Sequence, residues 1–66
     1  MAFTVKQARQ YAGFTQVEIA ERLGISRDAY RRIELNPGST PIELAQKFCQ
    51  VVGIGIDQIF FARDST

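Results

Sequence analysis

Arginine side chains are concentrated in the middle of this 66-residue chain. Four of its eight basic residues lie close together in the sequence: Arg22, Arg27, Arg31 and Arg32. A guanidinium group can donate two parallel hydrogen bonds to O6 and N7 of guanine, which discriminates between bases by about 1–3 kcal/mol. The chemistry that this cluster favours is therefore recognition of nucleic acid. The net charge is only +1, so the position of these charges matters more than their number.

The residue types on which most enzymes and metal sites depend are scarce. The chain has no histidine and one cysteine, Cys49, so it can form neither an internal disulfide nor a zinc cluster. No basic neighbour activates Cys49, which favours a buried structural thiol. The glycines form no phosphate-cradling loop. We therefore expect no enzymatic activity, no cofactor, no metal and no small-molecule ligand.

Two short amphipathic helices are predicted to position the arginines. Apolar residues recur at intervals of three and four in residues 16–23 and again in residues 26–35, where Tyr30 and Ile33 share the inner face. Gly24 lies in the tight turn between the two helices. The outer face of the second helix then holds Arg27, Asp28, Arg31 and Arg32. This hairpin has the layout of a helix-turn-helix, whose second helix enters a DNA groove.

Polar residues that can cap helices mark where the helices begin. Thr15, with Glu18 three residues later, predicts a capping box, in which each side chain accepts a hydrogen bond from the other residue's backbone N–H. Ser26 is expected to cap the second helix of the hairpin. Thr4 and Thr40 are predicted to cap further helices, the latter with a proline at the first helical position.

The rest of the chain supplies three more predicted helices, over residues 5–12, 41–52 and 55–61. Tyr11 is expected on the inner face of the first of them. We therefore predict an all-α fold, a compact five-helix domain that spans residues 1–66. Its helix-turn-helix unit covers about residues 15–35.

Neither a membrane span nor a secretory signal is expected. No stretch of the sequence approaches the roughly 18 consecutive apolar residues that a spanning helix needs. The first ten residues lack a basic region followed by an apolar one. The hydrophobic content of 45% argues against disorder. We expect a cytoplasmic, nucleoid-associated protein without a membrane partner.

The order and spacing of these features resemble the Cro/CI-type, XRE-like (lambda-repressor-like) helix-turn-helix family of small prokaryotic and phage repressors. The resemblance covers about residues 4–61. The matching residues are Ala8-Arg9, Gly13, Thr15-Gln16, Ile19-Ala20, Leu23-Gly24-Ile25-Ser26, Tyr30, Ile33-Glu34, Pro41, Val52-Gly53-Ile54, Asp57 and Ile59-Phe60.

This resemblance implies a homodimer that binds double-stranded DNA at a near-palindromic operator. It also implies an ion pair between Arg9 and Glu34, so we interpret Arg9 as structural. The family usually has a glycine one or two residues after the position of Glu34, whereas here the first glycine after it is Gly38. Ala8 is smaller than the aliphatic residue usual at its position.

The same resemblance implies which side chains contact DNA. It places base-reading side chains at Arg27, Asp28 and Arg32, and at Gln16 a contact to the DNA backbone and sometimes to a base. Arg31 shares their helix face, and Ser26 has a hydroxyl that can donate to a phosphate. Asp28 has two open interpretations, since its carboxylate can accept from a cytosine amino group or can orient the guanidinium group four residues later.

Other positions keep two interpretations. Asn36, Ser39 and Thr40 can donate to phosphates or can form the turn and cap the next helix. Phe60 is expected in the core. Phe61 is adjacent to Phe60 and cannot lie on the same helix face. It is a candidate dimer contact or covers the first helix of its own chain.

A protein-binding module of the same fold is the alternative function. Such a domain would be an anti-repressor or an antitoxin-like partner whose third helix meets protein instead of DNA. The low net charge favours this alternative slightly, whereas the arginines of the third helix favour DNA. The prediction is a sequence-specific DNA-binding transcriptional regulator of the Cro-like repressor type.

Overall fold

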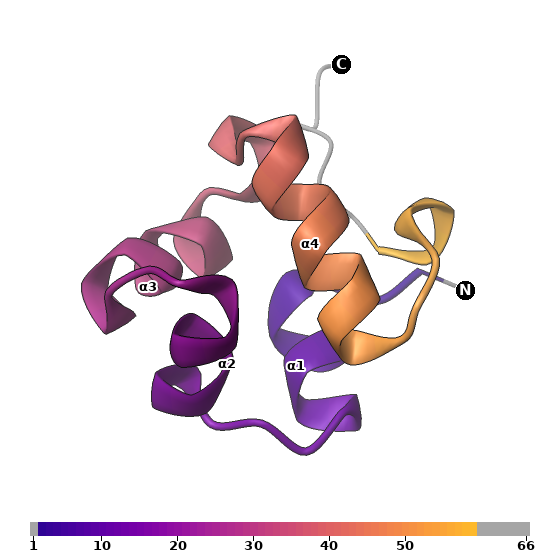
Figure 1. The fold of residues 1–66 in the computed structure, drawn as a ribbon. Coiled ribbons are helices and arrows are strands. Elements are labelled where there is room, and N and C mark those ends of the chain that lie inside the picture. Colours follow the sequence, from indigo (N-terminus) through magenta and orange to yellow (C-terminus); the bar gives the residue numbers. More distant parts are fainter. Residues whose placement is uncertain (1, 60–66) are drawn as a thin grey trace.

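The computed structural model describes residues 2–59, and four α-helices and two 3-10 turns lie within them (Figure 1). Their order is α1 (Val5–Tyr11), α2 (Gln16–Leu23), α3 (Arg27–Leu35), η1 (Pro37–Ser39), α4 (Ile42–Val52) and η2 (Ile56–Gln58). The all-α prediction is confirmed. The four α-helices begin and end within one or two residues of their predicted bounds.

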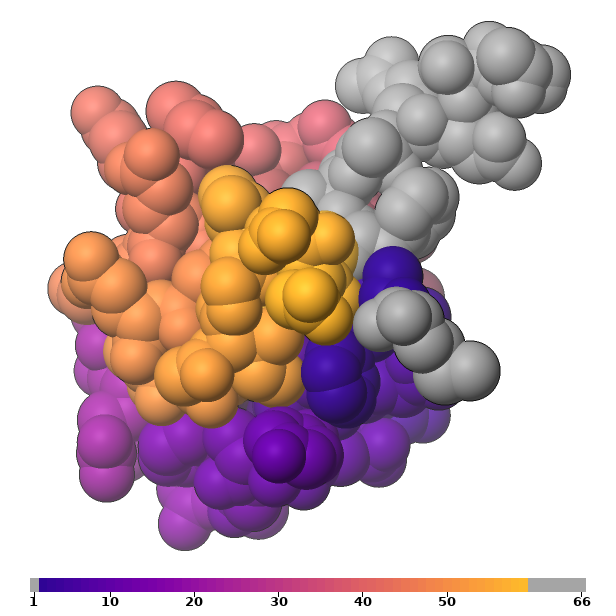
Figure 2. All heavy atoms as spheres, turned by 90° about the vertical axis from the view of Figure 1, so that its right-hand side faces the viewer, coloured from indigo at the N-terminus to yellow at the C-terminus, as the bar shows by residue number. Residues whose placement is uncertain are grey.

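The fifth helix predicted over residues 55–61 is wrong, because within residues 55–59 the chain forms only the 3-10 turn η2. Ile59 after it has extended backbone and makes a parallel β-bridge with Phe3. The backbone N–H of Phe3 donates to the carbonyl of Gln58 at 2.7 Å. Figure 2 shows the N-terminal segment and η2 side by side on the surface. The Gln58 carbonyl, which a longer helix would have used for its own hydrogen bonds, therefore accepts from the start of the chain instead. The predictions for Phe60 and Phe61 lie outside the described residues.

Capping boxes begin the first two helices. The Thr15 hydroxyl accepts from the Glu18 N–H at 3.1 Å, and the Thr15 N–H donates to the Glu18 carboxylate at 2.9 Å, as predicted. This backbone hydrogen bond lowers the pKa of Glu18. Thr4 and Gln7 form a second capping box, of which the sequence analysis predicted only the Thr4 cap. These local hydrogen bonds satisfy N–H groups that have no partner inside a helix.

The predicted cap at Thr40 is wrong. Pro41 occupies the N-cap position of α4 without a side-chain hydrogen bond, and the helix begins at Ile42. The Thr40 N–H closes η1 by donating to the carbonyl of Pro37 at 3.1 Å. A residue before proline is also held in extended backbone. The buried Thr40 hydroxyl has no hydrogen-bond partner within residues 2–59.

Buried side chains of α1, α2, α3 and α4 meet in one core that Ile59 closes. Its members are Val5, Ala8, Ile19, Ala20, Leu23, Tyr30, Ile33, Phe48, Cys49, Val52 and Ile59. Cys49 lies in this core, and burial raises the pKa of its thiol. Tyr11 was expected on the inner face of α1 but is 71% exposed, with its ring against Phe3 at 5.3 Å. Arg9, only 8% exposed, takes an inner position instead.

Candidate nucleic-acid interface

The helix α3 is held rigidly against the rest of the domain by one face. Tyr30 is fully buried and Ile33 nearly so. Ser26 caps the helix by accepting from the Ala29 N–H at 3.1 Å. Gly24 joins α2 to α3 with a positive φ of 75°, a conformation that costs glycine little. The hairpin is therefore a fixed platform for whatever the outer face of α3 carries.

The outer face of α3 is charged and exposed. It carries the four residues that the sequence predicted there: Arg27, Asp28, Arg31 and Arg32. Within residues 2–59, none of the three guanidinium groups on this face has an ion-pair or hydrogen-bond partner. The same holds for Asp28 within that range, so the structure does not show it orienting Arg32. Three donor groups are thus available to a ligand.

Arg22, the fourth arginine of the sequence cluster, is placed differently. Its guanidinium carbon lies 5.1 Å from the centre of the Phe14 ring, over the loop between α1 and α2. A contact of this kind is worth about 0.5–1 kcal/mol at an exposed site. Arg22 therefore stabilises the start of the hairpin and does not belong to the outer face of α3.

An open depression lies on α3 among Asp28, Arg31, Arg32 and Leu35. These positions are separated by three, four and seven residues, so they share one side of the helix. Leu35 is 75% exposed, the most exposed large hydrophobic side chain within the described residues. The sequence analysis treated Leu35 only as the end of the helix. Its position seven residues after Asp28 was the signal that could have placed it on the outer face.

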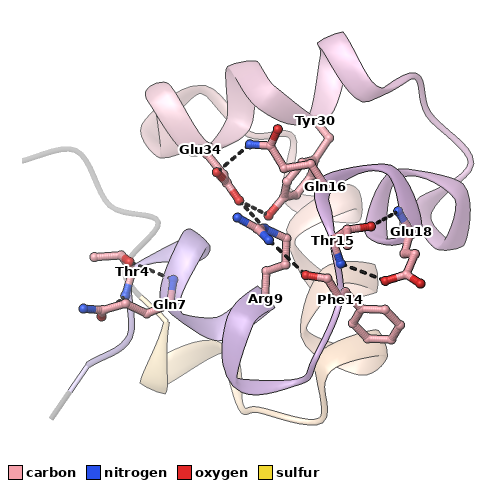
Figure 3. A network of polar contacts seen from close by, with 9 residues as sticks. All are labelled: Thr4, Gln7, Arg9, Phe14, Thr15, Gln16, Glu18, Tyr30 and Glu34. Carbon is pink, nitrogen blue, oxygen red and sulfur yellow. Dashed lines mark hydrogen bonds and ion pairs between the residues drawn. The ribbon is translucent and has the colours of Figure 1, made fainter.

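Behind α3, a polar network joins three helices (Figure 3). Arg9 of α1 donates from Nε to Glu34 Oε2 at 2.7 Å and from Nη1 to the Phe14 carbonyl at 2.9 Å. The Tyr30 hydroxyl donates to Glu34 Oε2 at 2.7 Å, and Gln16 Nε2 donates to Glu34 Oε1 at 3.0 Å. We call Arg9, Gln16, Tyr30 and Glu34 the Glu34 network.

The charges of the Glu34 network compensate one another. Burial acts to raise the pKa of Glu34, but the hydrogen bonds from Arg9, Tyr30 and Gln16 outweigh it and hold this pKa below its usual value. Burial and the hydrogen bond to Glu34 raise the pKa of Tyr30. Burial acts to lower the pKa of Arg9, yet Glu34 leaves it raised. The network is therefore a neutral ion pair with two added donors, and its hydrogen bonds fix α3 relative to α1 and α2.

Gln16 is placed by the structure in the Glu34 network, which the sequence analysis did not foresee. The resemblance implied only a contact from Gln16 to DNA. An amide NH₂ carries two donors, and one of them is used by Glu34. The other remains unused within residues 2–59, at the N-terminal end of α2.

The polar groups around α3 differ in whether they already have a hydrogen-bond partner. The Ser39 hydroxyl donates to the Asn36 carbonyl at 3.0 Å, so its proton serves the turn. The Asn36 N–H donates to the Arg32 carbonyl at 2.8 Å and ends α3. The Asn36 side chain is exposed and makes no hydrogen bond within the described residues. The Ser26 hydroxyl accepts within its cap and keeps its own proton for donation.

Two further kinds of feature are absent from residues 2–59. Among residues 2–59, no three side chains of the metal-binding types come together. In the same part of the chain, no helix is both long enough and apolar enough to span a bilayer.

A fixed helical hairpin that presents arginines from its second helix defines a DNA-binding helix-turn-helix domain. Comparison with known families agrees, because a family model described as helix-turn-helix matches residues 5–59. This match covers most of the chain, which therefore belongs to the Cro/CI-type, XRE-like helix-turn-helix family. The family binds DNA, acts in transcription regulation and is not enzymatic. Neither the curated proteins nor the solved structures gave a significant match.

Proposed function

We propose that the protein is a Cro-like repressor that binds a near-palindromic operator as a homodimer, with α3 in the major groove. The observation that carries this proposal is the contrast between the two faces of α3. Tyr30 and Ile33 anchor one face in the core. The other face carries exposed guanidinium groups that have no partner within residues 2–59. The major groove, about 12 Å wide, admits such a helix.

The side chains divide into readers of bases and contacts to the backbone. Arg27 and Arg32 read guanine from the outer face, and Arg31 supplies a third guanidinium group beside them. Asp28, which has no partner within residues 2–59, accepts from a cytosine amino group, the contact that a carboxylate makes in the major groove.

Phosphates are held at the start of each hairpin helix and after the end of α3. The second amide donor of Gln16 and the free proton of the Ser26 hydroxyl both lie at helix N-termini, where N–H groups and the helix dipole favour anions. The exposed Asn36 side chain provides a third donor after α3. Ser39 is in the same loop, but its proton is already donated to Asn36, so we assign it to the turn and not to a phosphate.

Dimerisation brings two copies of α3 to successive major grooves about 34 Å apart, one turn of the duplex. A domain of this size buries only about 60% of its unfolded surface, so a second copy adds stability that one small core does not supply. Phe61 remains a candidate contact between the copies.

Selection of bound duplexes from a random pool tests the proposal directly. The expected result is an enriched site with two inverted half-sites whose centres lie about 10 base pairs apart. Enrichment of a single half-site would contradict the homodimer. No enrichment at all would contradict operator binding and would favour the protein-binding module, which the net charge of +1 also allows.

A further inference from the structure

The depression on α3 combines charged and apolar surface. Arg31 and Arg32 bring guanidinium groups, and Leu35 brings an apolar side chain that is 75% exposed. Leu35 contributes nothing to the core cluster of the described residues. Leaving this apolar side chain in water is unfavourable, and a ligand that covers it removes that cost.

In the major groove, one base presents an apolar group at its edge. This is thymine, whose C5-methyl group lies beside its O4 acceptor. Guanine presents only acceptors to a guanidinium donor at its major-groove edge. A face with arginine and leucine side chains side by side therefore matches guanine and thymine side by side.

We propose that Leu35 reads the C5-methyl group of a thymine near the guanine that Arg31 or Arg32 contacts. This inference rests on the proposed function, since it requires α3 to lie in the major groove. Leu35 is then a specificity-determining residue, and it acts by apolar contact alone.

The spacing along α3 agrees with neighbouring bases. Arg31 and Leu35 are four residues apart, so they are separated by about 6 Å along the helix axis. Base pairs are stacked about 3.4 Å apart. The thymine therefore lies one or two base pairs from the guanine.

A second copy of the chain is a poor occupant of the same depression. A symmetric contact through Leu35 would bring Arg31 and Arg32 of both copies together, with Asp28 as the one acidic residue lining the depression. Like charges placed against each other oppose association. The electronegative groove edge of a guanine has no such conflict with Arg31 and Arg32.

The test compares thymine with uracil, which lacks only the methyl group. The probe is the duplex enriched by selection, with each thymine of a half-site replaced in turn by uracil. For the unaltered protein, we expect one position at which uracil weakens binding about fourfold, the equivalent of one buried methyl-sized group. For Leu35→Ala, thymine and uracil should bind equally at that position. Since Leu35 is exposed, this variant should keep its thermal unfolding midpoint.

Ile42→Ala is the matched control, because Ile42 is also an exposed aliphatic residue, at 63%, but does not line the depression. It should retain the fourfold preference for thymine. An enriched half-site without thymine near a guanine would overturn the inference. So would a preference for the methyl group that survives in Leu35→Ala, or a loss of affinity in that variant that is equal for both bases. Each of these results leaves operator binding intact, whereas the absence of any enriched duplex would overturn both proposals.

Discussion

Arginine has opposite environments on the two sides of α3. Arg9, behind the helix, is 8% exposed and donates from Nε to Glu34 and from Nη1 to the Phe14 carbonyl. Arg27 and Arg32, in front of it, are exposed and have no partner within residues 2–59. The same side chain thus serves the fold in one place and is free for a ligand in the other. Partners and burial, and not residue type, separate these roles.

This contrast predicts that the two sets of charges respond differently to mutation. Loss of a residue from the Glu34 network should change stability, because it leaves partners buried and unpaired. Loss of a charge from the outer face of α3 should change DNA recognition and leave stability nearly unchanged. The variants below test this difference, from the largest expected effect to the smallest.

Glu34→Ala should have the largest effect. It leaves the Arg9 guanidinium without its counter-charge, and the Tyr30 hydroxyl and the Gln16 amide without their acceptor. Side chains of the ion pair are only about a tenth exposed, so we expect the free energy of unfolding to fall by about 3 kcal/mol. Urea denaturation measures this change. Glu21→Ala, an exposed glutamate of α2, is the control and should change it little. A loss for Glu34→Ala no larger than that of the control would show that the network does not hold the helices together.

Arg32→Ala should affect binding and not folding. We expect discrimination at one base pair in each half-site to fall by about 1–3 kcal/mol, because a bidentate contact to guanine is lost. Binding to duplexes with each base substituted in turn measures this preference. Lys47→Ala removes an equal charge from the exposed surface of α4 and should leave every base preference intact. If Arg32→Ala weakened binding uniformly over all sequences, the residue would be a phosphate contact.

Tyr30→Phe tests one hydrogen bond of the network and keeps the buried ring. The lost bond runs from the hydroxyl to the Glu34 carboxylate at 2.7 Å, and hydrogen bonds to charged groups contribute about 1.5–3 kcal/mol. We expect a loss near the lower limit, about 1.5 kcal/mol, because Arg9 and Gln16 still donate to Glu34. Thermal and urea unfolding measure it. An unchanged stability would mean that the hydroxyl is as well satisfied by water as by Glu34.

Acidification should have the smallest effect on the network. The pKa of Glu34 is lower in the folded chain than its usual value of 4.5, so the stability it contributes is fully present above about pH 4.5 and is lost as the pH falls through the folded-state pKa. The hydrogen-bonded carboxylate of Glu18 acts in the same direction. In Glu34→Gln the fall in stability between neutral and acidic pH should be smaller than in the unaltered protein. Urea midpoints over this range measure the difference, and identical slopes would contradict the assignment.

Local signals in the sequence were sufficient for most helix bounds. The capping box of Thr15 and Glu18 and the glycine turn at Gly24 depend on residues within a few positions of one another. The outer and inner faces of α3 follow from its periodicity alone. The family followed from the order and spacing of these features along residues 5–59.

Contacts between residues far apart in sequence decided the rest. The bridge between Phe3 and Ile59 lies where the local sequence predicted a fifth helix. The hydrogen bond from Gln16 to Glu34 joins residues of two different helices, and the periodicity within each helix does not predict it.

The sequence by itself therefore determined the hairpin and the charges on its outer face, because capping, turn formation and amphipathicity act over one or two helical turns. The resemblance implied the ion pair between Arg9 and Glu34, but only the tertiary structure decided that this pair would be buried and that Tyr11 would lie outside on α1. The polarity of these side chains predicts the reverse, and the Glu34 carboxylate, 25 residues away, supplies the partner that makes burial of an arginine possible.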